Sequence, residues 1–468
     1  MYLHDTIVAP ATAPGIGAVA IVRLSGPRAR EIARILWHPL ATATHTTPAT
    51  RRLTLGEIRD PATGAPIDQA MLVVFAAPHT LTGEDVAELQ CHGGPYIVRR
   101  VVALATAAGA RRAEPGEFTR RAYLNGRLDL TAAEAIADLV AARGDAALAG
   151  ALAQLSGALA TRVDRLRMQV IAIRAHLEVE IDFADEDLAL PSRTEIANSI
   201  AALAADIEIL HGTFARGRII RDGARAAIVG KPNAGKSSVL NLLLGADRAI
   251  VTPIPGTTRD VIEDSVALGP WPLVLQDTAG LRDSVDPVER LGIDRARRSA
   301  AEADLIIAVF DASRPFDADD AGVIAALADR RGVALLNKRD LPATLSARDL
   351  RDRGVTLPIV ELSALVGDGV GDLRARLEQL VAALAGGDGA AYDSDGASLA
   401  ISRERHRDAL AAALEALRAA HRSVQAAMPP EIVAVDVAAA ADALGAITGA
   451  VETEDVLDAV FRDFCIGK

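Results

Sequence analysis

Short apolar runs alternate with helix-length segments in the middle of the chain. The runs are Ala226–Val229, Leu273–Leu275, Leu305–Phe310, Val333–Leu336 and Ile359–Leu362. Buried strands that alternate with helices are typical of a parallel sheet covered by helices on both faces. The pattern therefore predicts an α/β domain over residues 219–385.

Alanine- and leucine-rich segments with helical spacing flank this domain on both sides. They extend from about Thr131 to His211 and return from about Arg403, after the glycine-rich stretch Gly386–Ser398. Because the two ends of a domain usually lie close together, this arrangement favours a middle domain inserted into a helical one. We expect the helical domain to comprise residues 126–218 and 386–468.

The pattern changes again before residue 125. Strand-like runs at Ala18–Leu24, Met71–Phe75 and Val86–Leu89 alternate with short helices. A separate N-terminal α/β domain over residues 1–125 is the simplest interpretation. The expected fold class is thus α/β plus α.

Composition narrows the class of protein. A chain of 468 residues suggests about three domains, and 50% hydrophobic residues exclude a disordered chain. With 50 Lys and Arg against 62 Asp and Glu, the net charge of −12 excludes a uniformly basic nucleic-acid surface, although not a local patch. Membrane-length apolar runs and signal-peptide features are absent, and the two cysteines cannot build a zinc site, so we expect a cytoplasmic protein.

The strongest motif is Gly230–Ser237, which reads G-x-x-x-x-G-K-S between a predicted strand and a predicted helix. In such a loop the backbone N–H groups cradle phosphate, the lysine reaches the β/γ oxygens and the serine hydroxyl ligates Mg²⁺. The motif predicts nucleotide contacts at Asn233, Ala234, Gly235, Lys236, Ser237 and Ser238. Taken alone, a glycine loop that binds no phosphate remains the alternative.

Further motifs follow in the order typical of GTPases. The segment around Gly256–Asp260 offers Thr258 to Mg²⁺, and Asp277–Gly280 directly follows a strand. Two later segments, Asn337–Asp340 and Ser363–Leu365, each follow a predicted strand and resemble the guanine-recognition motifs of the GTPase family. In these motifs an aspartate accepts hydrogen bonds from N1–H and the exocyclic amine of guanine. We therefore predict GTP as the ligand, with these further contacts: Thr252, Pro253, Ile254, Pro255, Gly256, Thr257, Thr258, Asp277, Thr278, Ala279, Gly280, Asn337, Lys338, Asp340, Ser363 and Ala364.

The hydrolytic groups differ from those of Ras-like enzymes. Leu281 stands where a glutamine would orient the attacking water, and no arginine finger is evident. The side-chain carbonyl of Asn233 suits a monovalent cation near the β/γ bridge, aided by backbone carbonyls of the loop Ala249–Thr257. A role of Asn233 in stabilising the loop is the alternative.

The whole chain resembles the tRNA-modification GTPase family MnmE, also called TrmE. The resemblance rests on the GTPase motifs together with Asp5–Ala9, Arg23–Gly26, Thr82–Asp85, Glu88–Gly94, Pro115–Phe118, Leu128–Leu130 and Phe464–Lys468. It implies a folate-binding N-terminal domain, a helical domain and an inserted Ras-like P-loop GTPase domain. It also implies a homodimer that modifies C5 of the wobble uridine, position 34, of certain tRNAs. The partner would be the flavin-dependent protein MnmG (GidA), in a heterotetramer, and 5-formyl- or methylene-tetrahydrofolate would supply the one-carbon unit.

The same resemblance implies roles for individual residues. Asn233, Thr252, Ile254 and Thr257 would hold K⁺, and Glu289 would help Lys236 and Asn233 in catalysis by positioning water. Without the resemblance, Glu289 reads as a solvated helix charge. The folate-binding positions are Arg23, Glu88, Arg127 and Lys468. The chain departs from the family where Arg127 replaces a possible lysine and where the loop Gly15–Gly17 lacks an arginine.

Three questions stay open at this point. Cys465 either packs near the C-terminus or acts in the modification near the folate pocket. Candidate tRNA contacts are Arg216, Arg218, Arg221 and Arg225 and the pairs Arg111–Arg112 and Arg120–Arg121, although such runs are usually solvated faces. A GTP-gated ribosome-assembly factor and a switch that holds GTP without turnover are the alternative functions.

Overall fold

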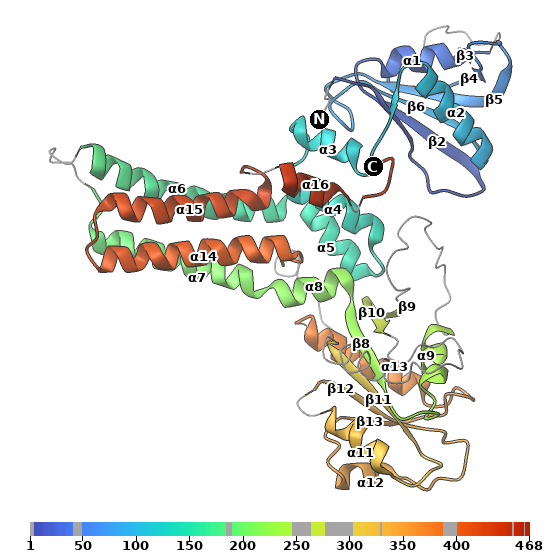
Figure 1. Ribbon diagram of the computed structural model, residues 1–468, viewed down its shortest axis with the longest axis vertical. Coiled ribbons are helices and arrows are strands. Elements are labelled where there is room, and N and C mark those ends of the chain that lie inside the picture. The colour runs from blue at the N-terminus through green and yellow to red at the C-terminus, as the bar shows by residue number, and fades with distance from the viewer. Residues whose placement is uncertain are drawn as a thin grey trace, which may run out of the picture. The chain divides into compact units, whose positions relative to one another are not determined.

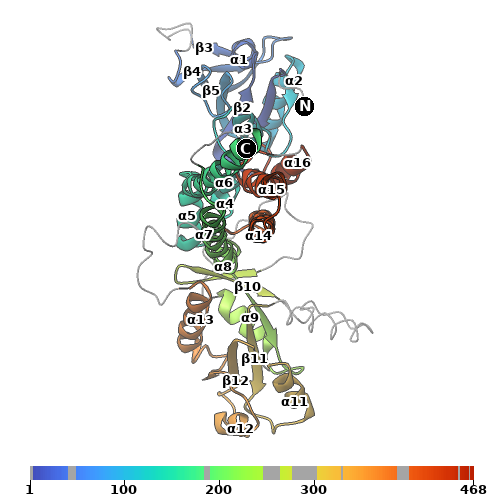
Figure 2. The same cartoon turned by 90° about the vertical axis from the view of Figure 1, so that its left-hand side faces the viewer.

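The computed structural model describes residues 4–40, 49–183, 190–245, 264–276, 303–327, 330–386, 400–451, 454–462 and 464–468. Contacts group these residues into two compact units (Figures 1 and 2). One unit runs to Ala137 and includes Gly445–Lys468, and the other comprises the described residues between Asp138 and Leu444. The boundary falls inside two helices, α4 (Leu130–Ala141) and α15 (Pro430–Thr448).

The first unit contains a seven-stranded sheet in the order β3-β4-β5-β6-β2-β1-β7. The strands are β1 (Ile7–Pro10), β2 (Gly17–Ser25), β3 (Trp37–Pro39), β4 (Thr54–Arg59), β5 (Pro66–Phe75), β6 (Val86–Gly93) and β7 (Arg111–Arg112). All neighbours are antiparallel except β1 and β7. Apolar residues of α1 (Ala29–Leu36) and α2 (Pro95–Ala107) share one core with inward residues of β2, β5 and β6. The three expected strands are confirmed.

The last residues of the chain belong to the same unit. Helix α16 (Glu454–Arg462) packs Leu457 and Phe461 against Leu130 and Ala133 of α4. Beyond it, Ile466 forms a bridge with Pro115, just before α3 (Glu117–Leu124). Gly467 has φ +98°, and a Cβ there would lie 1.9 Å from the carbonyl oxygen of Pro10. This close approach requires glycine and fixes the end of the chain beside β1.

Long helices form the next part of the second unit. They are α5 (Asp145–Leu155), α6 (Ala158–Asp182), α7 (Arg193–Gly212), α8 (Phe214–Asp222) and α14 (Glu404–Gln425), together with most of α15. Both views show α14 beside α7 and α15 beside α6. Buried residues of α6 recur at Leu166, Val170, Ile173 and Leu177, which is the spacing of one helix face. Ser192 begins α7 with a capping box that uses Glu195.

The second sheet has six strands in the order β13-β12-β11-β8-β10-β9. They are β8 (Ala224–Val229), β9 (Asp264–Leu268), β10 (Trp271–Gln276), β11 (Leu305–Asp311), β12 (Gly332–Asn337) and β13 (Ile359–Glu361). All pairs are parallel except β9 with β10. The five expected strands are confirmed. Strand β9 was not predicted. It begins with two polar residues, ends with the apolar Val266–Leu268 and pairs antiparallel at the edge of the sheet.

Helices cover both faces of this sheet, as expected. They are α9 (Lys236–Gly245), α11 (Ala318–Ala325), α12 (Ala347–Asp352) and α13 (Val370–Leu384). Strand β11 is buried throughout. Its residues Leu305, Ile307 and Val309 face the core shared with α9 and α13, whereas Ile306, Ala308 and Phe310 face the core shared with α12. Two buried faces explain why the strand has no polar alternation.

Within the described residues, no single helix combines the length and the hydropathy of a membrane span. Helices α5 and α6 have the required length and hydropathy only when taken together, and a bend of 48° separates them.

Candidate functional site

The phosphate loop joins the end of β8 to the start of α9. Gly230 packs so closely on β11 that a Cβ would lie 2.5 Å from the carbonyl oxygen of Val309. Gly235 has φ +100°, and a Cβ there would lie 2.2 Å from the side-chain nitrogen of Asn337. Asn233 also adopts a left-handed backbone, with φ 63°. Both glycines are therefore required, and the loop opens the N-terminus of α9, where backbone N–H groups favour an anion.

Lys236 folds back over this loop. Its ammonium donates to the carbonyl oxygens of Gly230 and Lys231, each at 2.9 Å. Ala234 is buried, Ser237 is half-buried, and Asn233 and Ser238 are exposed. A cation and a ring of backbone donors at one helix start are the groups that bind the phosphates of a nucleotide.

The two predicted base-recognition segments meet the phosphate loop through Asn337, the last residue of β12. Its side-chain amide donates to the carbonyl oxygen of Ala234 at 2.9 Å, and its side-chain oxygen accepts from the backbone N–H of Ala364 at 3.0 Å. The Ser363 hydroxyl donates to Asp340 at 2.5 Å. The carboxyl ends of β8, β12 and β13 thus form one edge, where open α/β sheets bind ligands.

Asp311 also belongs to this edge and was not predicted from the sequence. It ends β11, is buried, and accepts from the Lys338 ammonium at 2.6 Å and from the Ser313 backbone and hydroxyl at 2.9 and 2.6 Å. Burial acts to raise the pKa of the Asp311 carboxyl, but these hydrogen bonds outweigh it and hold the pKa below its usual value. The carboxylate stays charged and orients Lys338, whose φ is 67°.

Many predicted nucleotide and metal contacts lie outside the described residues. They are Thr252, Pro253, Ile254, Pro255, Gly256, Thr257, Thr258, Asp277, Thr278, Ala279, Gly280 and Glu289, and Leu281 lies there as well. Of the expected Mg²⁺ and K⁺ ligands, the structure therefore describes Ser237 and Asn233.

In the first unit, three of the four predicted folate-binding residues come together. Arg23 on β2 pairs in register with Glu88 on β6, and their side chains form an ion pair of 2.8 Å. The Arg23 guanidinium also donates to the carbonyl oxygen of Gly467 at 3.3 Å and lies 5.8 Å from the ring centroid of Phe118. The backbone N–H of Phe118 donates to the carbonyl oxygen of Lys468 at 3.2 Å.

The fourth residue, Arg127, is exposed and lies beside the turn at Gly83. Its backbone N–H donates to the carbonyl oxygen of Ala122 at 2.8 Å. Among the contacts of the described residues, none joins Arg127 to Arg23 or Glu88.

Several acids of the N-terminal motifs surround the fully buried Arg121. Its guanidinium pairs with Asp5, with Glu84 at 3.1 Å and with Glu117 at 3.0 Å. Arg111 also binds Asp5 and Glu117, at 2.6 and 2.5 Å. Burial acts to raise the pKa values of Asp5 and Glu117, but the hydrogen bonds from the two arginines outweigh it and lower both. These motif acids hold the domain together.

Most of the arginines considered for tRNA contact form ion pairs within the protein. Arg121 is buried, Arg111 is ion-paired, and Arg120 pairs with Asp458 at 2.6 Å. At the other candidate run, Arg218 pairs with Asp304, and Arg221 pairs with Asp222 at 2.6 Å. Internal ion pairs thus occupy five of these side chains, which argues against their serving as RNA contacts.

The two cysteines differ in environment. Cys91 is buried and donates weakly to the carbonyl oxygen of Ala20 at 3.6 Å. Burial and the charge of Asp68 raise its pKa to about 11. Cys465 is exposed, and its carbonyl oxygen accepts from the backbone N–H of Gly116 at 3.4 Å. Cys91 is therefore a core residue, whereas the Cys465 thiol is accessible.

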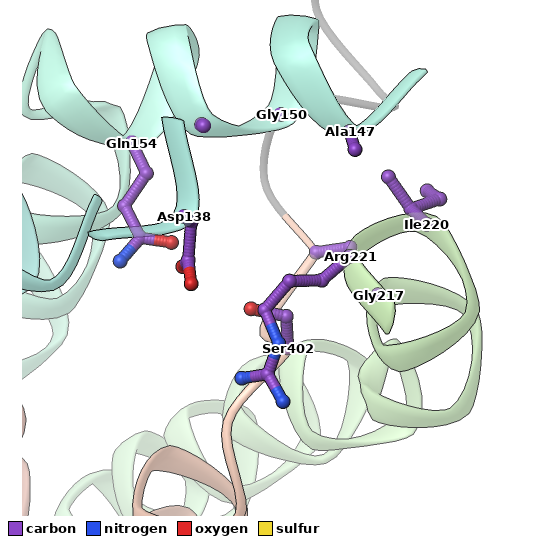
Figure 3. Close-up of a pocket in the computed structure, with 10 residues that line it drawn as sticks. Asp138, Ala147, Gly150, Gln154, Gly217, Ile220, Arg221 and Ser402 are labelled. Carbon is purple, nitrogen blue, oxygen red and sulfur yellow. The ribbon is translucent and has the colours of Figure 1, made fainter. Parts of the chain in front are cut away.

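A small cavity lies among α4, α5, α8 and the segment before α14 (Figure 3). Polar side chains of Asp138, Gln154, Arg221 and Ser402 line it. Its volume of about 30 Å³ is enough for roughly one water molecule. The phosphate loop and the Arg23–Glu88 pair contribute no residue to it.

Comparisons with known proteins identify the family of the chain. A family model described as the MnmE helical domain matches residues 130–465, and one described as the GTP-binding protein TrmE N-terminus matches residues 6–127. The chain is similar to proteins named tRNA modification GTPase MnmE from Heliobacterium modesticaldum (42% identity, 99% of each chain), Symbiobacterium thermophilum (44%, 99% of this chain and 100% of that protein) and Geobacter sulfurreducens (42%, 100% of each).

Proposed function

The chain belongs to the tRNA modification GTPase MnmE family, and we propose that it is a GTP hydrolase that acts in tRNA modification. The observation that carries the proposal is the double contact of Asn337 with Ala234 of the phosphate loop and with Ala364 of the base-recognition segment. It sets the groups for phosphate and for guanine at one edge of one sheet. The similarity over nearly the whole chain favours this function over ribosome assembly and over a switch without turnover.

In this proposal the phosphates lie at the start of α9. Lys236 and the loop N–H groups bind the β- and γ-phosphates, and Ser237 with Thr258 holds Mg²⁺. Asp340 accepts from the guanine edge, supported by the Ser363 hydroxyl that it binds at 2.5 Å. Asp277 and Gly280 act at the metal and the γ-phosphate, and Glu289 positions the attacking water.

A monovalent cation fits the position of Asn233. The Asn233 side chain is exposed on the phosphate loop and carries a neutral oxygen. The sequence also has a leucine, Leu281, at the position where a glutamine would orient the attacking water. We propose K⁺ there, with Asn233 and the carbonyl oxygens of Thr252, Ile254 and Thr257 as ligands. When bound, the ion supplies the positive charge that an arginine finger supplies elsewhere.

GTP turnover in KCl and in NaCl tests this site. We expect faster hydrolysis in KCl for the wild type and no difference between salts for Asn233→Ala. Asn198→Ala, an exposed asparagine of α7, is the matched control and should keep the K⁺ response. Equal wild-type rates in the two salts would contradict the cation proposal, and no turnover in either salt would contradict GTP hydrolysis.

For the first unit we propose a tetrahydrofolate site around Glu88. Arg23 engages one Glu88 oxygen, Oε1, so the other oxygen can accept from the amino-pyrimidine edge of a pterin. Arg127 and Lys468 would bind the glutamate tail, and Cys465 lies in the same C-terminal segment. Homodimers would then act with MnmG (GidA) on C5 of uridine 34, with the folate as the one-carbon donor.

Calorimetric titration with 5-formyl-tetrahydrofolate tests the folate site. Glu88→Gln should weaken binding, because an amide presents a donor where the pterin also donates. Glu31→Gln is the matched control, since Glu31 also pairs with an arginine, Arg28 at 2.8 Å, on the surface of the same unit. Equal affinity of wild type and Glu88→Gln would reject Glu88 as a folate ligand.

A further inference from the structure

Lys231, the second residue of the phosphate loop, does not point to solvent. Its side chain is only 6% exposed, and its ammonium lies 2.7 Å from Asp320 Oδ2 and 2.9 Å from Asp317 Oδ2. Both carboxylates belong to the start of α11, which lies far along the chain. The loop is thus tied to a second helix by a buried cation.

The two carboxylates are themselves fixed by the helix that they begin. Asp317 Oδ1 accepts from the backbone N–H groups of Asp319 and Asp320, each at 3.1 Å. Asp320 Oδ2 accepts from the backbone N–H of Asp317 at 3.2 Å. This is a capping box, and negative charge at a helix N-terminus is favourable. Hydrogen bonds within α11 itself therefore orient the two carboxylates that bind Lys231.

Electrostatics keep the Lys231 side chain charged in this position. Burial acts to lower the pKa of the ammonium, but the hydrogen bonds and charges of Asp320 and Asp317 outweigh it and raise the pKa above its ordinary value. The Lys231 ammonium donates to the carboxylates at the start of α11. Its effect on nucleotide binding therefore comes from the position that it gives to the loop backbone, and not from contact with phosphate.

The backbone of the same residue meets Lys236. The carbonyl oxygen of Lys231 accepts from the Lys236 ammonium at 2.9 Å, next to the Gly230 carbonyl at the same distance. We propose that Lys231 is a positioning residue for nucleotide binding: Asp317 and Asp320 fix its side chain, and its backbone carbonyl in turn fixes Lys236 toward the phosphates. The inference rests on the proposed function, in which this loop binds the phosphates of GTP.

A double-mutant cycle on GDP affinity tests this relay, with calorimetry on the full-length protein. Lys231→Met should weaken GDP binding roughly tenfold in the wild-type background. A change of this size is typical of the coupling between residues of one hydrogen-bond network. In the Lys236→Ala background the same change should have little further effect, because the group that the relay positions is absent. Lys231→Arg, which keeps the charge and both carboxylate contacts within reach, should restore most of the affinity.

Asp319→Asn is the matched control for Asp320→Asn. It removes one negative charge from the same helix turn, but Asp319 is exposed and has no bond to Lys231 among the described contacts. We expect weaker GDP binding for Asp320→Asn and wild-type binding for Asp319→Asn, with thermal unfolding recorded for each variant so that affinities are compared only between folded proteins.

Equal loss on Lys231→Met in both backgrounds would overturn the relay, as would equal effects of Asp320→Asn and Asp319→Asn. Nucleotide binding by the wild-type protein tests the proposed function independently of these variants. Absence of GDP and GTP binding by the wild-type protein would reject the nucleotide site itself, before any variant is compared.

Discussion

The side-chain amide of Asn337 and the carbonyl oxygen of Ala234 lie 2.9 Å apart, although 103 residues separate them along the chain. This hydrogen bond connects the loop for phosphate with the segment for the base. Asn337 is 2% exposed, and its side-chain oxygen accepts a hydrogen bond from the backbone N–H of Ala364. One buried amide thus holds two halves of the candidate nucleotide site in register.

Asn337→Ala should therefore weaken guanine-nucleotide binding and lower stability together. The substitution leaves the Ala234 carbonyl and the Ala364 N–H without this partner in a buried position, at about 1–3 kcal/mol for each group left unsatisfied. Calorimetric GDP titration and thermal unfolding measure the two effects. A variant with wild-type affinity would show that this amide does not organise the site.

Gly235→Ala should abolish nucleotide binding by a steric route. Its φ of +100° is unfavourable for alanine, and the new Cβ would lie 2.2 Å from the Asn337 nitrogen. Gly371→Ala is the matched control, because Gly371 lies in α13 with ordinary φ and open space around it. The control should bind GDP as the wild type does. Normal GDP binding by Gly235→Ala would contradict the described loop geometry.

The elements of the fold were more predictable from the sequence than the contacts between charged side chains. Buried strands such as Leu305–Phe310 stand out as continuous apolar runs, whereas edge strand β9 begins with two polar residues, Asp264 and Ser265, before its short apolar run. Arg121 reads as a solvated charge beside Arg120, because its partner Asp5 lies 116 residues away. Lys231 likewise has no apparent role until the fold brings Asp320 to it across 89 residues.

The Arg121 cluster predicts acid sensitivity in the first unit. The pKa values of Asp5 and Glu117 lie below their ordinary 3.8 and 4.5, so their stabilisation is complete above about pH 4.5 and is lost as the pH falls through the native pKa values. Glu117→Gln should therefore reduce amide protection of β1 near neutral pH, with a smaller difference from wild type in acid. Hydrogen–deuterium exchange at each pH measures this.

Glu31→Gln serves as the control for that experiment, because Glu31 is exposed on α1 and pairs with Arg28 instead. It should leave β1 protection unchanged at every pH. A constant difference between wild type and Glu117→Gln down to about pH 3 would show that the Glu117 carboxylate does not titrate with the fold.

The two thiols should react at very different rates with an alkylating reagent in the native protein. Cys465 is exposed, whereas Cys91 is buried with its pKa raised to about 11, so little thiolate forms at neutral pH. We expect one fast-reacting thiol by intact-mass spectrometry and none in Cys465→Ser. Fast labelling of Cys91 in the folded protein would contradict the described core of the first sheet.

The most direct test of the account is nucleoside mass spectrometry of bulk tRNA from cells that lack this gene. Cells are compared without a copy, with the wild-type copy and with a Lys236→Ala copy. We predict that aminomethyl-type modifications at C5 of wobble uridine disappear without the gene, return with the wild-type copy and stay absent with Lys236→Ala. Unchanged nucleosides in cells without any copy of the gene would contradict a role in tRNA modification, and full restoration by Lys236→Ala would contradict its dependence on GTP.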